Sequence, residues 1–217
     1  NKKIDLNKFS NIDYLVHLAW SSLDNFDDKK HLSIILPKHI YFLSRIIKLN
    51  NFKKIIIAGT CLEYGDKYQG KLSEELKSNP SINYAKAKFN LYKEVLKLKK
   101  KYQFKFDWLR IFYVYGYSGV RNTLWRQMNK KSSLTINYPN SIKDFIHVDE
   151  IVNNLLKLIF INKSYNIINV CSGKCWNLKR TINYWKKKYN LKIKVSFSNN
   201  NLKTGIYGDN KKIKSIK

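Results

Sequence analysis

Acidic residues are scarce in this sequence. Its 217 residues include 15 Asp and Glu against 42 Lys and Arg, so the formal net charge is +27. Arginine is scarce too: five of the basic residues are arginine and the other 37 are lysine. Proteins that read phosphates and base edges favour the arginine fork. We therefore interpret the lysine excess mainly as AT-rich codon usage. Specific nucleic-acid binding becomes a minor alternative, and a mild preference for anionic ligands remains.

The sequence also has few cysteines and no long apolar run. The three cysteines, Cys61, Cys171 and Cys175, form no CxxC pair and no metal-ligand spacing. This excludes a disulfide scaffold and a structural zinc site, and it predicts free thiols in a reducing cytoplasm and no bound metal. No apolar run approaches the roughly 20 residues that a membrane span needs, so we expect no membrane insertion. No signal peptide opens the chain, although its first residue is Asn1 rather than Met.

Hydrophobic residues make up 44% of the chain, enough for a folded core. In the first half, apolar runs alternate with segments of helical periodicity. The pattern predicts strands at 14–20, 53–60 and 106–116, with helices at 31–50 and about 82–101. Such alternation is typical of βαβ units in a parallel α/β sheet, which binds ligands at the carboxyl ends of its strands. The segments "HLAW", "GTCLEYG" and "FYVYG" lie at those ends and predict one shared crevice.

The character of the sequence changes after Gly116. We predict a helix in 120–131, two short strands around a Pro-Asn turn in 133–148, a helix at about 149–162, a strand at 166–172 and a helix at 178–190. The tail from Asn199 is polar and rich in lysine. The predicted domains are a partial Rossmann-like cofactor domain at 1–117 and, at 118–217, mainly a smaller α+β substrate lobe with segments that return to the sheet.

Tyrosine followed by lysine four residues later is a candidate catalytic pair, because the two side chains share one helix face. With so many lysines the motif alone carries little weight. It occurs three times, at Tyr84–Lys88, Tyr184–Lys188 and Tyr207–Lys211. Tyr84 follows a strand that ends in a hydroxyl residue, Thr60, and the order of the neighbouring segments sets this pair apart from the other two. We therefore select Tyr84 and Lys88.

Six weak motifs occur in a fixed order: "HLAW", "IIIAGTCLEYG", "YAKAK", "WLRIFYVYG", "KDFIHVDE" and "INVCSGK". Together they resemble the extended short-chain dehydrogenase/reductase family, namely the NAD-dependent epimerase/dehydratase group that acts on nucleotide sugars. The resemblance covers about 13–217 and is greatest to a 6-deoxy-talose 4-dehydrogenase-like branch. It implies a doubly wound Rossmann-like parallel sheet, NAD or NADP as cofactor, and a nucleotide-sugar substrate in polysaccharide assembly.

The resemblance also implies a triad. Tyr84 is the acid/base that exchanges a proton with a sugar hydroxyl while hydride leaves the same carbon, taken here to be C4. Lys88 supports Tyr84 and holds the nicotinamide ribose, and Thr60 binds the reacting oxygen. A free phenol titrates near ~10, so we expect the ammonium and a cationic nicotinamide to lower the pKa of Tyr84. Leu18, Ala19 and Phe112 are expected beside the cofactor.

The substrate is expected at Trp20, Tyr113 and Lys143, each of which differs from the usual family residue. Trp20 can equally be a core tryptophan. We interpret His17, His147, Asp149 and Cys171 as structural, with Asp149 as a helix N-cap. The resemblance implies a homodimer through the helices at 31–50 and 82–101.

Two departures narrow the function. None of the eight glycines forms the family's G-x-x-G-x-x-G turn, which holds the pyrophosphate. We therefore expect the sequence to lack that N-terminal segment and, as printed, to bind a dinucleotide poorly. Cys61 and Leu62 replace the Asp-Glu of the dehydratases, and Glu63 stands one place late, which argues against 4,6-dehydration. The alternative is a non-catalytic or truncated homologue that acts as a binding or scaffold protein.

Overall fold

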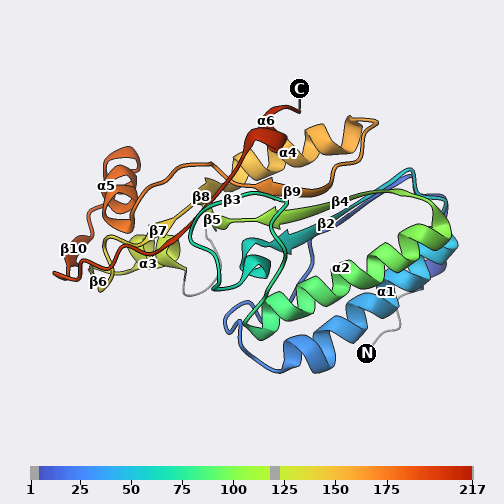
Figure 1. Ribbon diagram of the computed structural model, residues 1–217, viewed down its shortest axis with the longest axis horizontal. Helices are drawn as coiled ribbons and strands as arrows, with labels where there is room; N and C mark the ends of the chain where they lie inside the picture. Colours follow the sequence, from blue (N-terminus) through green and yellow to red (C-terminus); the bar gives the residue numbers. More distant parts are fainter. Residues whose placement is uncertain (1–4, 118–122, 217) are drawn as a thin grey trace. The chain divides into compact units, whose positions relative to one another are not determined.

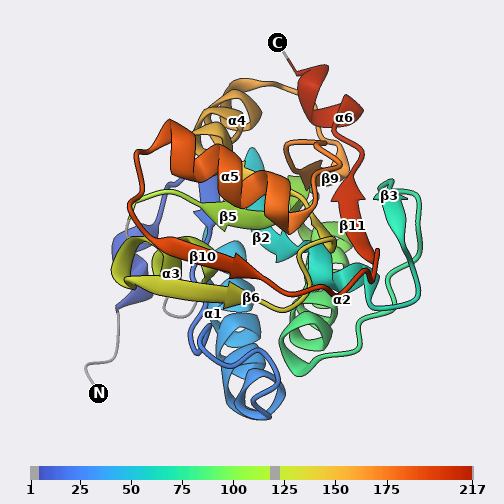
Figure 2. The same cartoon turned by 90° about the vertical axis from the view of Figure 1, so that its left-hand side faces the viewer.

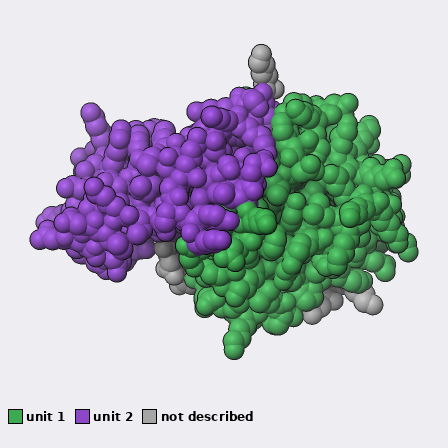
Figure 3. All heavy atoms as spheres, viewed as in Figure 1, with its two compact units in different colours: residues 1–66, 77–110, 155–168 green, residues 67–76, 111–154, 169–217 purple. Residues whose placement is uncertain are grey.

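The structure is a computed structural model that describes residues 5–117 and 123–216. It divides into two compact units, coloured separately in Figure 3. Unit 1 comprises residues 1–66, 77–110 and 155–168, and unit 2 comprises 67–76, 111–154 and 169–217. The chain thus passes between the units several times. Residue 118 and the start of the predicted helix at 120–131 lie outside the described residues.

Within the described residues, unit 1 is built on a sheet of four strands in the order β1-β2-β4-β9. β1 (Tyr14–His17) runs parallel to β2 (Lys54–Thr60), with Tyr14 opposite Lys54. β4 (Lys105–Ile111) and β9 (Asn166–Val170) follow on the other side of β2. Every residue of β2 is buried, as expected for an apolar run at the centre of a parallel sheet. The predicted strand at 14–20 ends three residues early, at His17.

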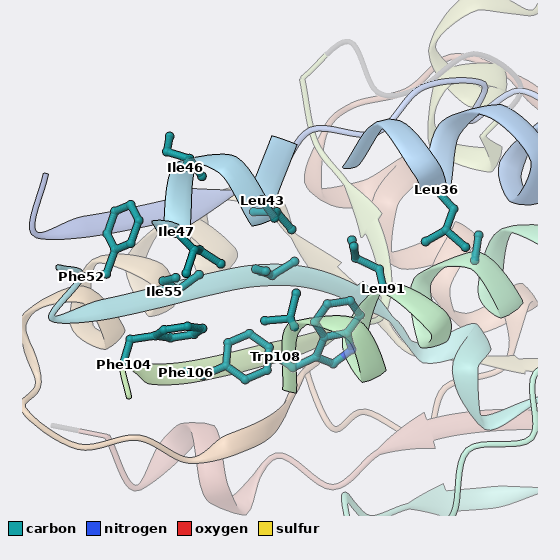
Figure 4. Packing of buried hydrophobic residues seen from close by; sticks show 13 residues of the cluster. Leu36, Leu43, Ile46, Ile47, Phe52, Ile55, Leu91, Phe104, Phe106 and Trp108 are labelled. Carbon is teal, nitrogen blue, oxygen red and sulfur yellow. The ribbon is translucent and has the colours of Figure 1, made fainter. Parts of the chain in front are cut away.

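Two long helices pack on one side of this sheet (Figure 1). α1 (Leu36–Leu49) is preceded by a π-helical turn, His31–Ile35, and α2 spans Asn83–Tyr102. Figure 4 shows the core between the helices and the strands, where side chains such as Leu43, Ile47 and Leu91 meet Ile55 and Trp108. Each such fully buried side chain stabilises the fold by roughly 1.5–3 kcal/mol relative to an exposed one. The two predicted helices are therefore present, with bounds within about two residues of those predicted.

Unit 2 contains short strands that pair over long sequence distances. β11 (Gly205–Gly208) lies between β3 (Gly70–Leu72) and β7 (Ile142–Lys143) and runs parallel to both. β5 (Tyr113–Tyr115) pairs with β8 (Phe145–His147), and β6 (Ser133–Ile136) pairs with β10 (Lys194–Phe197), both in parallel. Figure 2 looks onto β6 and β10. The remaining helices of the described chain are α3 (Leu124–Lys130), α4 (Val148–Phe160), which runs on into unit 1, α5 (Leu178–Lys188) and α6 (Lys211–Lys214).

One prediction about this part of the chain was wrong. The predicted strand at 106–116 is two strands, because the backbone changes partner: Phe112 N–H donates to Val170 O, and Tyr113 N–H donates to Asp144 O. Short strands lie on both sides of the Pro-Asn turn, as predicted, and β6 and β7 belong to different sheets. The polar tail from Asn199 carries β11 and α6.

Asp144 organises unit 2, a role that sequence reasoning missed. Its carboxylate is fully buried and accepts hydrogen bonds from the N–H groups of Ser172 (2.9 Å), Gly173 (2.9 Å) and Gly208 (3.1 Å), and from the Ser172 hydroxyl (2.6 Å). A buried carboxylate needs this many donors to offset its desolvation. Asp144 thereby connects the end of β9 to β11. The sequence motifs "KDF" and "NVCSG" therefore lie in contact within unit 2.

Candidate active site

Thr60 ends β2 and begins a 3-10 turn, Cys61–Tyr64. The Thr60 hydroxyl oxygen accepts the Leu62 N–H at 3.3 Å, and the Thr60 N–H donates to Glu63 Oε1 at 2.9 Å. The Thr60 side chain also accepts the Glu63 N–H, and this bond and the one from the Thr60 N–H to Glu63 form a capping box, which fixes the chain where it leaves the strand. Thr60 is therefore a buried hydroxyl in a defined orientation at the carboxyl end of the sheet.

Tyr84 lies in the first turn of α2. A remote segment caps this helix: Asp27 Oδ1 accepts the Asn83 N–H at 3.1 Å, and Phe26 O accepts the Tyr84 N–H at 2.8 Å. The Tyr84 ring stacks on Phe26, with 5.0 Å between ring centroids, and its side chain hydrogen-bonds with Thr60. The tyrosine hydroxyl thus meets the end of β2, as the motif order predicted.

Lys88 follows one helical turn later on the same face. Its side chain is 1% exposed, and Nζ donates to Ala58 O at 2.7 Å and lies 6.0 Å from the Tyr84 ring centroid. The structure therefore brings Thr60, Tyr84 and Lys88 together within unit 1.

Burial has opposite effects on the two ionisable groups. It raises the pKa of Tyr84 above its ordinary value, assisted by the charges of Glu63 and Cys61 and opposed by the hydrogen bond with Thr60. It lowers the pKa of Lys88 to about 7, opposed by the charge of Glu63. The expectation of a lowered Tyr84 pKa is thus not met in this structure, because desolvation of the phenolate is the largest effect.

The segment after β1 covers Lys88. Leu18 is 51% exposed and Ala19 is exposed, whereas the Trp20 indole lies over Lys88 Nζ, 4.2 Å from the nearer ring centroid. Trp20 also stacks on His39, with 4.5 Å between centroids and 6° between ring planes. As the structure stands, Trp20 packs against the chain's own residues at the edge of the candidate site.

Two histidines, His31 and His39, contact this indole, and His17 contacts His39. Trp20 Nε1–H donates to His31 Nδ1 at 3.1 Å, and since an indole nitrogen can only donate, His31 carries its proton on Nε2 and donates to Asn25 O. His17 Nε2 lies 3.0 Å from His39 Nδ1. Burial, their mutual proximity and the Lys88 charge lower the pKa of His17 to about 4, and burial and Lys88 do the same for His39. Sequence reasoning missed His31 and His39, which face inward from the π-helical turn and α1.

The other predicted residues belong to unit 2. Phe112 is 3% exposed. Lys143 Nζ lies 5.1 Å from the Tyr113 ring centroid, so these two predicted substrate residues are neighbours within unit 2. His147 Nδ1 accepts the Asp149 N–H at 3.2 Å. The predicted N-cap at Asp149 was wrong, because α4 begins at Val148 and Asp149 lies inside its first turn.

Cys61, Cys171 and Cys175 are free thiols. Across 5–117 and 123–216, no three His, Cys, Asp or Glu side chains lie close enough to hold a metal ion. No helix in this part of the chain has the length and apolarity to cross a membrane.

Comparison with known proteins identifies the family. Residues 3–171 match the NAD dependent epimerase/dehydratase family. The chain belongs to this family. It is similar to the dTDP-6-deoxy-L-talose 4-dehydrogenase (NAD(+)) of Aggregatibacter actinomycetemcomitans, with 29% identity over 203 residues, 91% of this chain and 73% of that protein.

Solved structures show the same fold at low identity. A UDP-N-acetylglucosamine 4-epimerase from Methanobrevibacter ruminantium gives a TM-score of 0.81 at 22% identity, covering 98% of this chain and 73% of that one. A UDP-glucuronic acid 4-epimerase from Bacillus cereus in complex with NAD gives 0.76 at 21% identity, covering 98% and 70%. The predicted Rossmann-like α/β fold and membership of the NAD dependent epimerase/dehydratase family are therefore confirmed.

Proposed function

We propose that this family member is an NAD(P)-dependent nucleotide-sugar oxidoreductase or epimerase that transfers hydride at a sugar carbon, C4. The observation that carries the proposal is the cluster of a buried strand-end hydroxyl, a tyrosine and a lysine at Thr60, Tyr84 and Lys88. C4 is favoured because the talose relative is named as a 4-dehydrogenase and the two solved relatives as 4-epimerases.

The protonation state of Tyr84 suits the reduction of a sugar carbonyl. With its pKa raised, Tyr84 is a neutral phenol at neutral pH, so it can donate its proton to a sugar oxygen that becomes negative as the carbonyl is reduced. The reverse direction requires Tyr84 to accept that proton, which a charged Lys88 nearby favours. Thr60 adds a second hydrogen bond and thereby orients the reacting oxygen.

The residues at the end of β1 suit the nicotinamide end of a dinucleotide. Leu18 and Ala19 are exposed after the end of β1. The Tyr84 hydroxyl and the Lys88 amine are donors suited to a ribose diol. A bound nicotinamide would supply the acceptor or donor of the hydride. Because Trp20 covers Lys88 Nζ, the amine reaches a ribose only after the indole moves. We propose Phe112 as a further packing contact, and we assign no residue of this chain to the pyrophosphate.

For the substrate we propose Lys143 and Tyr113. The Lys143 ammonium can pair with the diphosphate of a nucleotide sugar, and Tyr113 lies beside it in unit 2. Trp20 is proposed as a third contact once it leaves Lys88. A cytoplasmic location suits both the free thiols and a nucleotide-sugar substrate. A homodimer through α1 and α2 stays a prediction, favoured by the exposure of Ile34 (44%) and Tyr41 (63%).

Tyr84→Phe tests the function. Removing the hydroxyl is expected to lower turnover of dTDP- or UDP-activated sugars with NAD or NADP by about 100-fold or more, since general acid–base catalysis contributes about 10²–10⁴-fold. Tyr92→Phe, two turns further along α2, is the matched control and is expected to keep its turnover. Equal turnover in Tyr84→Phe and the parent contradicts the assignment. Nucleotide-sugar binding without turnover by the parent favours the non-catalytic alternative.

A further inference from the structure

Beneath the candidate site lies a fully buried carboxylate, that of Glu63. Trp108 Nε1–H donates to both of its oxygens at 3.0 Å, Arg110 Nε donates to Oε2 at 3.4 Å, and Thr60 N–H donates to Oε1 at 2.9 Å. Every partner that the described structure gives this carboxyl is a donor. Burial raises the pKa of the Glu63 carboxyl, and the Arg110 charge and these donors oppose that rise by favouring the acceptor-only carboxylate form.

The surrounding sequence makes room for this carboxylate and holds it. A Cβ at Gly59 would lie 2.2 Å from Trp108 Nε1 and 2.6 Å from Glu63 Oε1, so any other residue there would displace the contact. Arg110, which is 2% exposed, is itself held by Ser78 Oγ at 2.6 Å. The segments "GTCLE" and "WLR" therefore meet at Glu63.

Glu63 is coupled to the candidate triad through Thr60. Its bond to the Thr60 N–H is one half of the capping box, and the Thr60 hydroxyl in turn hydrogen-bonds with Tyr84. Without the Glu63 acceptor, the Thr60 N–H would be buried and unpaired, and the turn would lose the bond that orients it.

Glu63 also acts on the site through its charge. The carboxylate raises the pKa of Tyr84 and opposes the lowering of the Lys88 pKa by burial. Interactions among buried charges are screened far less than those at the surface. Glu63 is not exposed to any ligand, so it does not exchange protons with a substrate.

We propose that Glu63 is a positioning residue, whose carboxylate, held between Trp108 and Arg110, fixes the turn that carries Thr60 and sets the local field at Lys88. The catalytic part of this inference rests on the proposed function. The structural part can be measured without turnover.

The first measurement follows Lys88 by NMR of protein labelled at the lysine ε-carbon. The signal is assigned by its loss in Lys88→Met, and its titration midpoint is expected near pH 7 in the parent. The charged or titratable groups that face Lys88 are His17 on β1, His39 on α1, Glu63, and Tyr84 on its own helix. Glu63→Gln removes one of these charges at nearly constant shape, so the midpoint is expected to fall. Glu94→Gln, at an exposed site on α2, is the control and leaves it unchanged.

The second measurement keeps the inference testable if Glu63→Gln does not fold. Glu63→Asp retains the charge but shortens the side chain by one methylene. The Lys88 midpoint is then expected to stay close to that of the parent, while amide exchange at Thr60 becomes about tenfold faster, the size expected for one lost hydrogen bond. Unchanged Thr60 exchange in Glu63→Asp overturns the positioning role, and an unchanged Lys88 midpoint in folded Glu63→Gln overturns the electrostatic one.

Turnover separates this inference from the proposed function. In an active preparation, Glu63→Gln is expected to lower kcat with little change in KM, because Thr60 acts on the reacting oxygen, and Glu63→Asp is expected to recover part of the loss. A KM effect with unchanged kcat contradicts the positioning role. If the NMR and exchange results hold but the parent shows no turnover, the positioning role of Glu63 stands and the proposed function fails.

Discussion

Lys53 and Lys54 are adjacent in sequence but differ sharply in environment, so they provide a matched test. Lys54 is 2% exposed and pairs with the fully buried Asp107, with 2.8 Å between Nζ and Oδ2. Its ammonium also donates to Leu158 O at 2.5 Å and Lys163 O at 2.9 Å, near the end of α4. Lys53 forms an ion pair with Asp13 at 3.2 Å, but both side chains are more than half exposed.

Lys54→Met is expected to destabilise the fold by about 3–5 kcal/mol, because it leaves the Asp107 carboxylate buried without its counter-charge. For a chain of this length each kcal/mol lowers Tm by about 2–4 °C, so we expect a fall of roughly 6–20 °C. Lys53→Met should change the stability by less than about 0.5 kcal/mol, since exposed pairs contribute little. In the double variant Lys54→Met with Asp107→Asn, part of the loss should be recovered, since the uncompensated charge is gone.

Urea unfolding followed by circular dichroism measures the free energy of unfolding of the parent, the two single variants and the double variant. Thermal unfolding is a second probe. A loss below about 1 kcal/mol in Lys54→Met would refute the reasoning, because a buried charge left unpaired must cost more than that. Equal losses in Lys53→Met and Lys54→Met would refute it as well, since burial would then make no difference.

Three further predictions concern the candidate site and unit 2. Trp20→Ala uncovers the Lys88 amine and is expected to raise the Lys88 pKa above about 7, measured by NMR of the ε-carbon. The pKa of His17 and of His39 is about 4 when folded and 6.5 otherwise, so the unfolded chain binds more protons between these values. The stability contributed by the neutral histidines is fully present above pH 6.5 and is lost on acidification towards pH 4. The free energy of unfolding falls by at most about 1.4 kcal/mol per pH unit for each histidine. His39→Gln should make this fall smaller, as measured by urea unfolding at several pH values. Asp144→Asn weakens the hydrogen bonds from the Ser172 and Gly208 N–H groups. It is expected to lower the free energy of unfolding by about 1–3 kcal/mol in the same assay.

The fold was predictable where its signals are local. The apolar run of β2 and the helical periodicity of α1 and α2 are properties of short segments, and these elements lie where expected. β3, β10 and β11 are three or four residues long, and each pairs with a strand more than 60 residues away. Nothing in such a segment by itself indicates its partner. The break at Phe112 was missed for the same reason, because it depends on a change of hydrogen-bond partner and not on hydrophobicity.

The candidate site was partly predictable. The order of the motifs selected Tyr84 among three Tyr-x-x-x-Lys pairs, and the structure places Lys88 and Thr60 beside it. The direction of the Tyr84 pKa shift could not be predicted, because burial depends on packing from several elements. Glu63 was considered only as a displaced dehydratase residue. Gly59, one residue before Thr60, was the available signal, since a missing side chain beside a turn often marks a close approach.

Burial and charge act together on the candidate triad. Glu63 is the fully buried acidic group that acts on both Tyr84 and Lys88 in the described structure, and Arg110 pairs with it. Burial therefore keeps Tyr84 protonated at neutral pH and lowers the pKa of Lys88 to about 7, so Tyr84 is set to donate a proton rather than to accept one. Within the proposed function, a sugar carbonyl would accept this proton as it is reduced. Reduction at C4 is accordingly the direction that the described state favours within the proposed function, whereas oxidation first requires Lys88 to be charged and Tyr84 to become more acidic.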